Sequence, residues 1–259
     1  MNSSALRIRS LGQTGFRFEF AGTVIYVDPY LSNSVQEKEA DDLARLIPIP
    51  VLPIDITDAD CIIITHEHRD HCDLDTLLPI SEASSMCYFL GPPAVVDKLE
   101  NAGITPERIW TARCGVARQL GPEWEIHPVP SAHPRVERDD QGACRWLGYV
   151  IRAGSRYIYH AGDTSVDKEV IAAVKAVGKI DMAFLPVNER NYYREHRGII
   201  GNMSVREAFH FAEEIGASAV VPTHWDMFEA NSVYKEEIEL LYEKISPKFE
   251  LLFEPGTIE

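Results

Sequence analysis

The stretch Thr65-His66-Glu67-His68-Arg69-Asp70-His71 comes directly after the apolar run 61–64, which predicts a buried strand that ends in three imidazoles and a carboxylate. Imidazole nitrogen and carboxylate oxygen are ligands that suit zinc, iron and manganese. His66 and His68 are two positions apart, and Asp70 with His71 forms a second pair, so one loop offers ligands to two neighbouring ions. A solvated polar loop is the alternative interpretation, and it leaves the spacing unexplained.

Further candidate ligands follow later strands of the chain. His133 stands in Pro-Ser-Ala-His-Pro, Asp163 ends Tyr-His-Ala-Gly-Asp, and His224 follows Val-Val-Pro-Thr. We expect His133 to join the first pair of the cluster on one ion and His224 to join the second pair on another, with the carboxylate of Asp163 bridging the two ions. Each is a weak signal alone, but the ordered set is specific. The predicted metal ligands are His66, His68, Asp70, His71, His133, Asp163 and His224.

With these residues in place, the His-x-His-x-Asp-His cluster resembles the metallo-β-lactamase fold superfamily. Within it, the chain is similar to the L-ascorbate-6-phosphate lactonase family. That similarity rests on Leu-Gly-Gln-Thr-Gly-Phe at 11–16, the cluster extended to 65–73, Tyr-His-Ala-Gly-Asp at 159–163, Arg-Gly-Ile-Ile-Gly-Asn-Met-Ser at 197–204 and Val-Val-Pro-Thr-His-Trp-Asp at 220–226. The chain departs from the ascorbate enzyme at His133, where an aspartate is expected, and at Trp225, where a histidine is expected.

The resemblance implies a metal-dependent hydrolase that opens a sugar-derived lactone, phosphorylated or not, by attack of hydroxide held by two divalent ions, zinc or manganese. The predicted catalytic residues are Asp70, which orients the nucleophile and takes a proton, and His160, which either donates a proton to the leaving oxygen or packs behind the ligands. Two alternatives stay open. One is a phosphodiesterase or general esterase of the same fold, and the other is a non-catalytic module that binds a metal or metabolite.

A loop at 188–198 brings three arginines, two tyrosines and a histidine into an otherwise acidic chain. Arginine binds phosphate or carboxylate in a bidentate manner, and the helix N-terminus after Asn202 adds free N–H groups. A solvated connection is an equally weighted alternative for the loop. The residues beside His224 either line the pocket or pack its loop. The predicted substrate-binding residues are Arg190, His196, Arg197, Asn202, Trp225 and Asp226.

Composition restricts the partners. The formal net charge of −15 would repel phosphate backbones, so we expect no nucleic acid, while a small substrate, including an anionic one, stays compatible with the site. No run of about 18 apolar residues occurs, and residues 1–5 lack the basic and apolar blocks of a signal peptide. We therefore expect no membrane partner and a cytoplasmic location. The oligomeric state is open, with a homo-oligomer among the alternatives.

The cysteines give a further compositional signal. The chain has five, an odd and scattered set without a Cys-x-x-Cys motif, which argues against a disulfide framework and a structural zinc ribbon. We expect them to be reduced and mostly buried. For Cys72, beside His71, a packing role is favoured over a contact behind the metal ligands.

Hydrophobic periodicity predicts the fold class. Apolar alternation and turn residues predict strands at 8–20, 24–27, 61–64, 86–90, 145–152, 156–160, 180–187, 219–222 and 249–253, and helices at 73–80, 94–101, 166–177, 205–215 and 233–245. Short strands are also expected within 104–129, and a loop with one helical turn at 32–53. Strand-rich runs that each finish in helices predict an α/β fold, a four-layer αββα sandwich of two mixed sheets with helices outside. We expect a single domain, 1–259, with pseudo-repeated halves at about 1–130 and 131–259.

Overall fold

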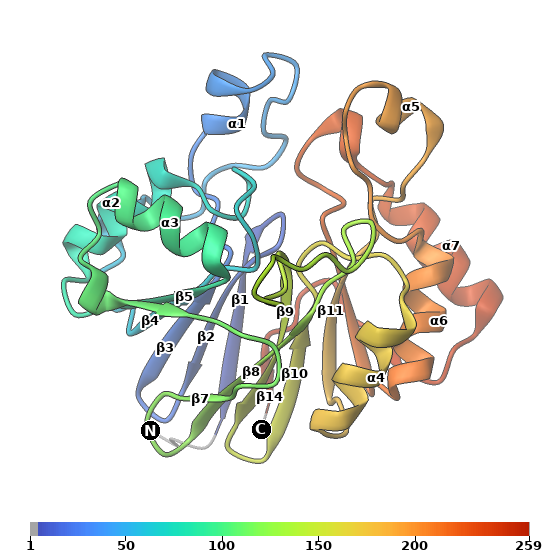
Figure 1. The fold of residues 1–259 in the computed structure, drawn as a ribbon. Coiled ribbons are helices and arrows are strands. Elements are labelled where there is room, and N and C mark those ends of the chain that lie inside the picture. Colours follow the sequence, from blue (N-terminus) through green and yellow to red (C-terminus); the bar gives the residue numbers. More distant parts are fainter. Residues whose placement is uncertain (1–4, 259) are drawn as a thin grey trace. The chain divides into compact units, whose positions relative to one another are not determined.

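The apolar run before the histidine cluster forms β4 (Cys61–Ile63), a fully buried strand inside a seven-stranded mixed sheet. The structure, a computed structural model, describes residues 5–258 (Figure 1). β4 pairs in parallel with β3 and with β5, which explains why its residues are continuously apolar and do not alternate. The sheet has the order β14-β1-β2-β3-β4-β5-β6. Its other strands are β1 (Leu6–Gly12), β2 (Gly15–Phe20), β3 (Thr23–Val27), β5 (Tyr88–Gly91), β6 (Ile109–Thr111) and β14 (Thr257–Ile258).

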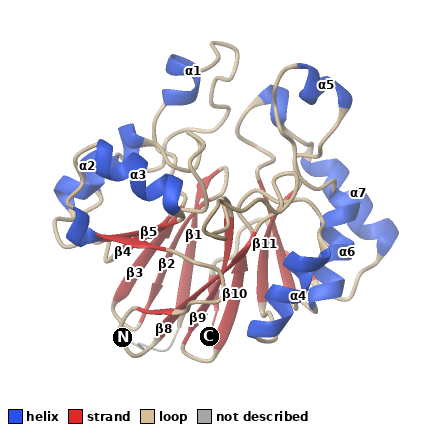
Figure 2. Cartoon of the chain, viewed as in Figure 1, coloured by secondary structure: helices blue, strands red, loops and turns tan. Residues whose placement is uncertain are grey.

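Helices accompany this first sheet (Figure 2). They are α1 (Ser34–Lys38), α2 (Leu74–Ala83) and α3 (Pro93–Asn101), with 3-10 turns η1 (Pro53–Asp55) and η2 (Pro106–Arg108). The buried Leu77 of α2 and Leu99 of α3 share one core with Ile62 and Phe89 of the sheet. Asp73 begins α2 by accepting the backbone N–H of Asp75 at 3.2 Å. α2 continues three residues beyond its predicted end at residue 80.

The second sheet is also mixed and seven-stranded, with the order β13-β12-β11-β10-β9-β8-β7. β10, β11, β12 and β13 are parallel, whereas β9 is antiparallel to both β8 and β10. β8 therefore runs in the same direction as β10, β11 and β12. The strands of this second sheet are β7 (Arg118–Gln119), β8 (Trp124–Pro130), β9 (Leu147–Ala153), β10 (Arg156–His160), β11 (Met182–Pro186), β12 (Ala219–Thr223) and β13 (Glu250–Leu251).

The helices beside the second sheet are α4 (Lys168–Val177), α5 (Tyr192–His196), α6 (Val205–Ile215) and α7 (Lys235–Ile245), with a 3-10 turn η3 (Glu229–Asn231). The capping box that starts α6 is present: Ser204 accepts the N–H of Glu207, and the Glu207 carboxylate accepts the N–H of Ser204 at 2.8 Å. Gly216 ends α6 with a φ of 71°, a left-handed conformation that glycine adopts at little cost. α5 is a helical turn inside the segment 188–198, which the sequence predicted as a loop.

The chain forms two compact units, Met1–Ala112 with Glu254–Glu259 and Arg113–Phe253, each built on one sheet. The first unit includes β14, near the end of the chain. The predicted single domain with repeated halves stays a prediction. The prediction that the chain has no signal peptide rests on residues 1–5. Residues 1–4 of that segment lie outside the described residues. None of the helices in residues 5–258 has the length and apolar character needed to cross a lipid bilayer.

A buried hydroxyl in the hydrophobic core beside the second sheet allows a prediction about stability. Tyr159 on β10 is fully buried, its hydroxyl has no hydrogen-bond partner among residues 5–258, and burial raises the pKa of that hydroxyl. We expect Tyr159→Phe to raise the free energy of unfolding by about 1 kcal/mol, because it removes an unpaired buried polar group. Tyr26→Phe is the matched control, since the Tyr26 hydroxyl donates to Asp58 at 2.9 Å and its loss should lower stability. Urea denaturation measures both; an equal loss of stability in the two variants would contradict this account.

Candidate metal centre

Asp28, directly after β3, organises the hydrogen bonds behind the histidine cluster. Its buried carboxylate accepts the backbone N–H of Thr65 at 2.8 Å and the Thr65 hydroxyl at 2.6 Å, and it lies 2.8 Å from Nδ1 of His71. Because the hydroxyl hydrogen goes to Asp28, the Thr65 oxygen accepts from Nδ1 of His66 at 3.0 Å. Both imidazoles are thus held with Nδ1 as the donor, which leaves Nε2 as the candidate ligand atom. Asp28 therefore braces both imidazoles from behind.

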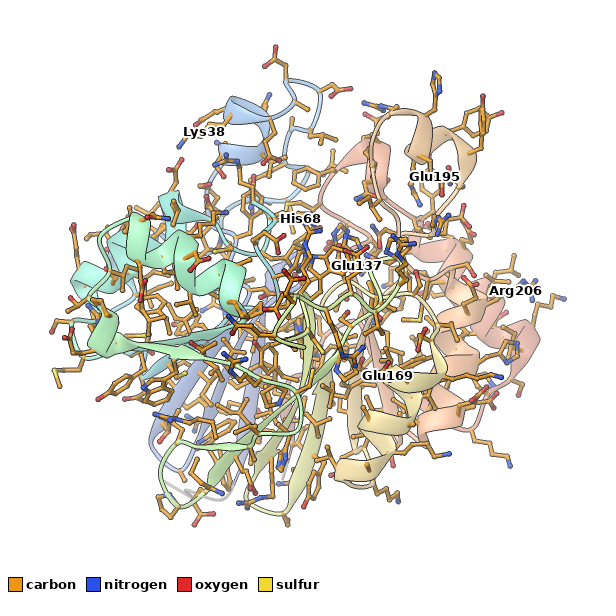
Figure 3. The ribbon with its side chains drawn as sticks, in the orientation of Figure 1. Lys38, His68, Glu137, Glu169, Glu195 and Arg206 are labelled. Carbon is orange, nitrogen blue, oxygen red and sulfur yellow. The ribbon has the colours of Figure 1, made fainter. Side chains whose placement is uncertain are left out.

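His66 and His68 form the first ligand pair in the loop after β4, where Figure 3 labels His68. Nε2 of His66 lies 3.0 Å from Nδ1 of His68. Two nitrogens that coordinate one tetrahedral ion at about 2.0–2.1 Å lie about 3.3 Å apart. The separation fits two ligands of one ion, although it also suits an N–H···N hydrogen bond.

Asp70 and His71 form the second pair, and the turn between β1 and β2 supports it. Asp70 Oδ2 lies 3.7 Å from Nε2 of His71, which is too long for a hydrogen bond and suits two ligands of one ion. Gln13 donates to the same Asp70 oxygen at 2.7 Å, and the Thr14 hydroxyl lies 3.1 Å from Nδ1 of His71. The Leu-Gly-Gln-Thr-Gly-Phe motif therefore has a physical role in placing this pair.

In the second unit, Asp163 stands between two histidines. Its Oδ2 lies 3.7 Å from Nε2 of His133, and its Oδ1 lies 3.5 Å from Nε2 of His224. Each carboxylate oxygen thus faces a different imidazole at the separation of two ligands of one ion. A carboxylate placed in this way would be able to give one oxygen to each of two ions.

A row of carboxamides holds His133. Asn202 Oδ1 lies 3.1 Å from Nδ1 of His133, and the Asn202 amide donates to Asn188 at 2.9 Å. Since the amide hydrogens face Asn188, the Asn202 oxygen faces the imidazole, so His133 donates through Nδ1 and presents Nε2. Gly201 allows the approach, because a Cβ there would lie 2.3 Å from the carbonyl oxygen of Glu189.

Strand direction brings these side chains to one edge of the second sheet. His133 follows β8, Asp163 follows β10, Asn188 follows β11 and His224 follows β12. These four strands run the same way, so their carboxyl ends share an edge, where open α/β sheets commonly bind ligands.

Backbone strain also gathers at the candidate ligands and their supports. Gln13, Asp28 and His224 have φ values of 59°, 42° and 59°, in the left-handed region that residues other than glycine rarely adopt. Such strain costs on the order of 1–3 kcal/mol per residue and is typical of functional sites. Three of the five such residues in the described part of the chain therefore lie at the candidate ligands and their supports, the other two being Ala21 and Ser246.

Cys72, next to His71, belongs to the core. It is fully buried and lies in the cluster that includes Leu77 and Ile80. Burial raises the pKa of its thiol to about 12, so the thiol stays protonated near neutral pH. The predicted packing role is confirmed.

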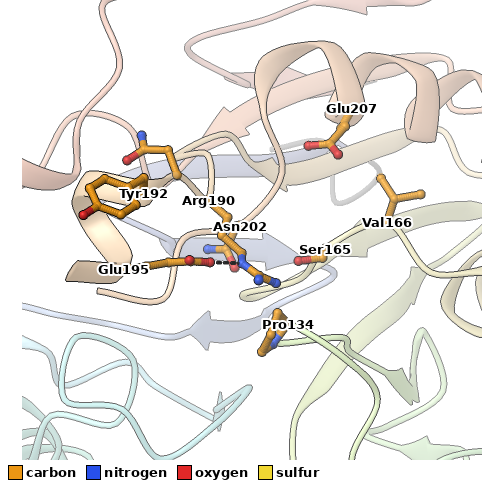
Figure 4. Close-up of a pocket in the computed structure, with 9 residues that line it drawn as sticks. Pro134, Ser165, Val166, Arg190, Tyr192, Glu195, Asn202 and Glu207 are labelled. Carbon is orange, nitrogen blue, oxygen red and sulfur yellow. Dashed lines mark hydrogen bonds and ion pairs between the residues drawn. The ribbon is translucent and has the colours of Figure 1, made fainter. Parts of the chain in front are cut away.

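The predicted anion-binding arginines are exposed. Arg190 pairs with Glu195, and both line a cavity of about 400 Å³ in the second unit (Figure 4). The exposed His196 ring stacks on Tyr192, with centroids 6.0 Å apart, and Arg197 is exposed at the end of α5. The cavity is lined by Pro134, Ser165, Val166, Arg190, Asn191, Tyr192, Glu195, Asn202 and Glu207.

The third arginine of this loop, Arg194, has a structural contact pattern that the sequence did not reveal. Its buried guanidinium donates to the carbonyl oxygens of Glu189 and Ser232, each at 2.6 Å, and burial lowers its pKa. Arg194 thereby fastens α5 to the segment after η3. In the sequence, three arginines occur within eight residues, and that pattern does not distinguish Arg194 from Arg190 and Arg197.

The remaining predicted site residues have packed environments. His160 is buried, stacks on Phe184 with centroids 6.0 Å apart, and accepts the N–H of Gly162 at 3.3 Å through Nδ1. The Trp225 indole donates to the carbonyl oxygen of Pro222 at 3.2 Å, and Asp226 is half-buried. The roles of His160, Trp225 and Asp226 in catalysis or substrate binding stay predictions.

Two mixed sheets with helices, whose strands end in these histidines and aspartates, define an α/β protein of the metallo-β-lactamase fold. A β-lactamase superfamily domain is matched over residues 23–225. The chain therefore belongs to the β-lactamase superfamily, as its cluster predicted. The similarity to the lactonase family stays a prediction.

Individual relatives cover nearly the whole chain. A metal-dependent hydrolase of Pyrobaculum neutrophilum is 26% identical over 255 residues, which are 98% of this chain and 99% of the relative. A metallo hydrolase from Ignicoccus hospitalis has a TM-score of 0.70 at 21% identity over 99% of both chains. A diiron β-hydroxylase from Streptomyces venezuelae has a TM-score of 0.68 at 17% identity and covers 100% of this chain and 55% of its own. The two solved structures establish a likeness of fold alone.

The contacts of Asp28 predict its effect on metal affinity. In Asp28→Asn, the amide group meets donors on Thr65 or His71, so we expect metal affinity to fall about 10–100-fold. Calorimetric titration of chelator-stripped protein with zinc measures this, with circular dichroism to verify folding. Asp75→Asn is the control, because that exposed carboxylate pairs with Lys38 and is not a candidate ligand. Equal affinities in wild type and Asp28→Asn would refute the bracing argument.

Proposed function

We propose that this protein is a metal-dependent hydrolase whose histidines and aspartates hold a pair of divalent ions, zinc or manganese, and that it opens a small sugar-derived lactone. The observation that carries the proposal is Asp163, whose two oxygens face the imidazoles of His133 and His224. A binding-only module would have no need of a bridging carboxylate, which argues against the non-catalytic alternative.

The donor set fits divalent ions. His66, His71 and His133 each have Nδ1 engaged by an acceptor, so Nε2 is the nitrogen that would serve as the ligand atom, and the aspartates supply oxygen. The names of the relatives from Pyrobaculum neutrophilum and Ignicoccus hospitalis describe metal-dependent hydrolysis, which supports the same class here. The diiron β-hydroxylase shares the fold, so the reaction must be argued from the site and tested.

When bound, such ions would lower the pKa of a water molecule toward neutrality and polarise the ester carbonyl. The chain's own residues would supply orientation and proton transfer. Gln13 holds one oxygen of Asp70, which fixes the carboxylate that we assign to orienting the nucleophile and accepting its proton. His160 accepts a backbone N–H at Nδ1, so its Nε2 carries the proton that would go to the leaving oxygen.

The cavity behind the ligands of the second unit is our candidate for the part of the substrate that does not react. Pro134 follows His133, Ser165 lies two residues after Asp163, and Asn202 bonds His133, so the cavity adjoins the ligand residues. Its side chains are mostly polar, and the charge of Arg190 is offset by Glu195 (Figure 4). Hydroxyl groups of a sugar lactone suit such a lining, and a phosphate would have to compete with Glu195 for the guanidinium.

The metal requirement is tested through Asp163. We expect wild type purified without chelator to hold two equivalents of zinc or manganese and Asp163→Asn to lose metal and at least about 100-fold in turnover, because the bridge between the ions is gone. Elemental analysis and rates after reloading with each metal provide the readouts. Asp140→Asn, at an exposed loop carboxylate, is the matched control. Full metal content and full turnover in Asp163→Asn would reject the two-ion centre.

The substrate class is tested on a panel of sugar lactones, acyl-homoserine lactones and bis-p-nitrophenyl phosphate. We expect turnover of sugar lactones, and we expect Asp70→Ala and His71→Ala to abolish it while circular dichroism stays unchanged, because both residues would hold the same ion. Turnover of the phosphate diester alone would replace the lactonase by the phosphodiesterase alternative. Undiminished rates in both variants would remove the catalytic assignment.

A further inference from the structure

Two cysteines far apart in sequence meet in the second unit. The Sγ atoms of Cys114 and Cys144 lie 2.7 Å apart, although 30 positions separate the residues. Cys114 precedes Gly115, whose N–H donates to the carbonyl oxygen of Pro128 on β8 at 3.2 Å. Cys144 forms an isolated antiparallel bridge with Arg138 in the loop before β9. The pairing thus depends on two anchored backbone segments.

The charge distribution around the pair favours one thiolate. The hydrogen bond from the Cys114 thiol to the Cys144 sulfur lowers the pKa of Cys144, and the Arg138 guanidinium acts in the same direction. The same hydrogen bond and burial raise the pKa of Cys114. Arg138 is held in place by an ion pair with Glu169 in the first turn of α4, which Figure 3 labels. The favoured form therefore has the thiolate on Cys144 and the proton on Cys114, and transfer of that proton along the hydrogen bond gives the minor form with the thiolate on Cys114.

The other cysteines differ in environment. Cys61, Cys72 and Cys87 are fully buried, and burial raises the pKa of Cys72 and of Cys87 to about 12. Buried thiols that stay protonated are poor nucleophiles. Cys114, by contrast, is partly exposed, so a small oxidant has access to the pair.

We propose that Cys114 and Cys144 form a redox pair that closes to a disulfide on reaction with a small disulfide such as oxidised glutathione. In the minor form, with the proton on Cys144, the thiolate of Cys114, which is the more accessible of the two sulfurs, attacks one glutathione sulfur, forming a mixed disulfide and releasing one glutathione thiolate. The Cys144 sulfur, after loss of its proton, then attacks Cys114 Sγ and displaces the second glutathione. Two protein thiols are oxidised, and one glutathione disulfide is reduced to two thiols.

The new bond would brace a loop that carries a candidate metal ligand. The segment between β8 and β9 begins near His133 and ends near Trp146, whose ring meets the His133 imidazole edge-on with centroids 5.4 Å apart. Cys144 lies two residues before Trp146. Cross-linking Cys144 to Cys114 restricts the unfolded chain and this loop, so we expect a higher thermal midpoint in the oxidised protein.

The test is thiol counting on the full chain. Reduced protein is incubated with oxidised glutathione, alkylated in denaturant and digested for peptide mass spectrometry. We expect alkylated cysteines to fall from five to three, with one cross-linked peptide that joins Cys114 to Cys144. We expect the midpoint of the oxidised form to rise by about 5–10 °C. Cys144→Ser should instead trap Cys114 as the glutathione mixed disulfide and show no rise.

Three results would overturn the proposal. They are five alkylated cysteines in the treated wild type, a cross-link that uses Cys61, Cys72 or Cys87, and an unchanged midpoint in cross-linked protein. The thiol count and the thermal midpoint of the wild type test the proposal by themselves, so the proposal can still be refuted if Cys144→Ser fails to fold.

Discussion

The placement of a carboxylate between two imidazoles constrains the rest of this site. Burying an ionised carboxylate costs several kcal/mol unless opposite charge lies nearby, and the oxygens of the buried Asp163 lie 3.7 and 3.5 Å from Nε2 of His133 and His224. Positive charge from bound ions would compensate that cost. Each supporting contact then has a reason, because an imidazole can offer Nε2 to an ion only when an acceptor holds the hydrogen on Nδ1. Asn202 provides that acceptor for His133.

The sheets explain how residues so far apart in sequence acquire this arrangement. In the first sheet, Asp28 follows β3 and the histidine cluster follows β4, which pairs in parallel with β3. The turn before β2 lies at the same edge, because β2 is antiparallel to β3. In the second sheet, the ligand residues follow strands of common direction. The loops after these strands need to supply only one or two side chains each, and the strand ladder fixes their spacing. A shift of register by one residue would reverse the side chains of a whole strand.

Sequence reasoning found the residues that follow strands and missed those that depend on tertiary pairing. The ligand candidates could be read because a polar cluster after an apolar run is a local pattern, and the capping box of α6 is equally local. Gln13 and Thr14 sit in an ordinary turn signal, and only the pairing of β2 with β1 and with β3 directs them at Asp70 and His71. The contact between Cys114 and Cys144 has the same origin, since no spacing rule relates positions 30 residues apart. The helical turn α5 was missed because five residues are too few to show a period.

The arginines of the loop 188–198 bear on the substrate more than their number suggests. The buried guanidinium of Arg194 donates to backbone carbonyl oxygens, which would otherwise lack partners. Arg190 is paired with Glu195, and Arg197 is exposed at the end of α5. A loop that looks basic in sequence therefore offers little unopposed positive charge at the cavity, whose lining also includes Glu207. With a net charge of −15 on the chain, a neutral polyhydroxylated lactone would enter this cavity at lower electrostatic cost than a phosphorylated one.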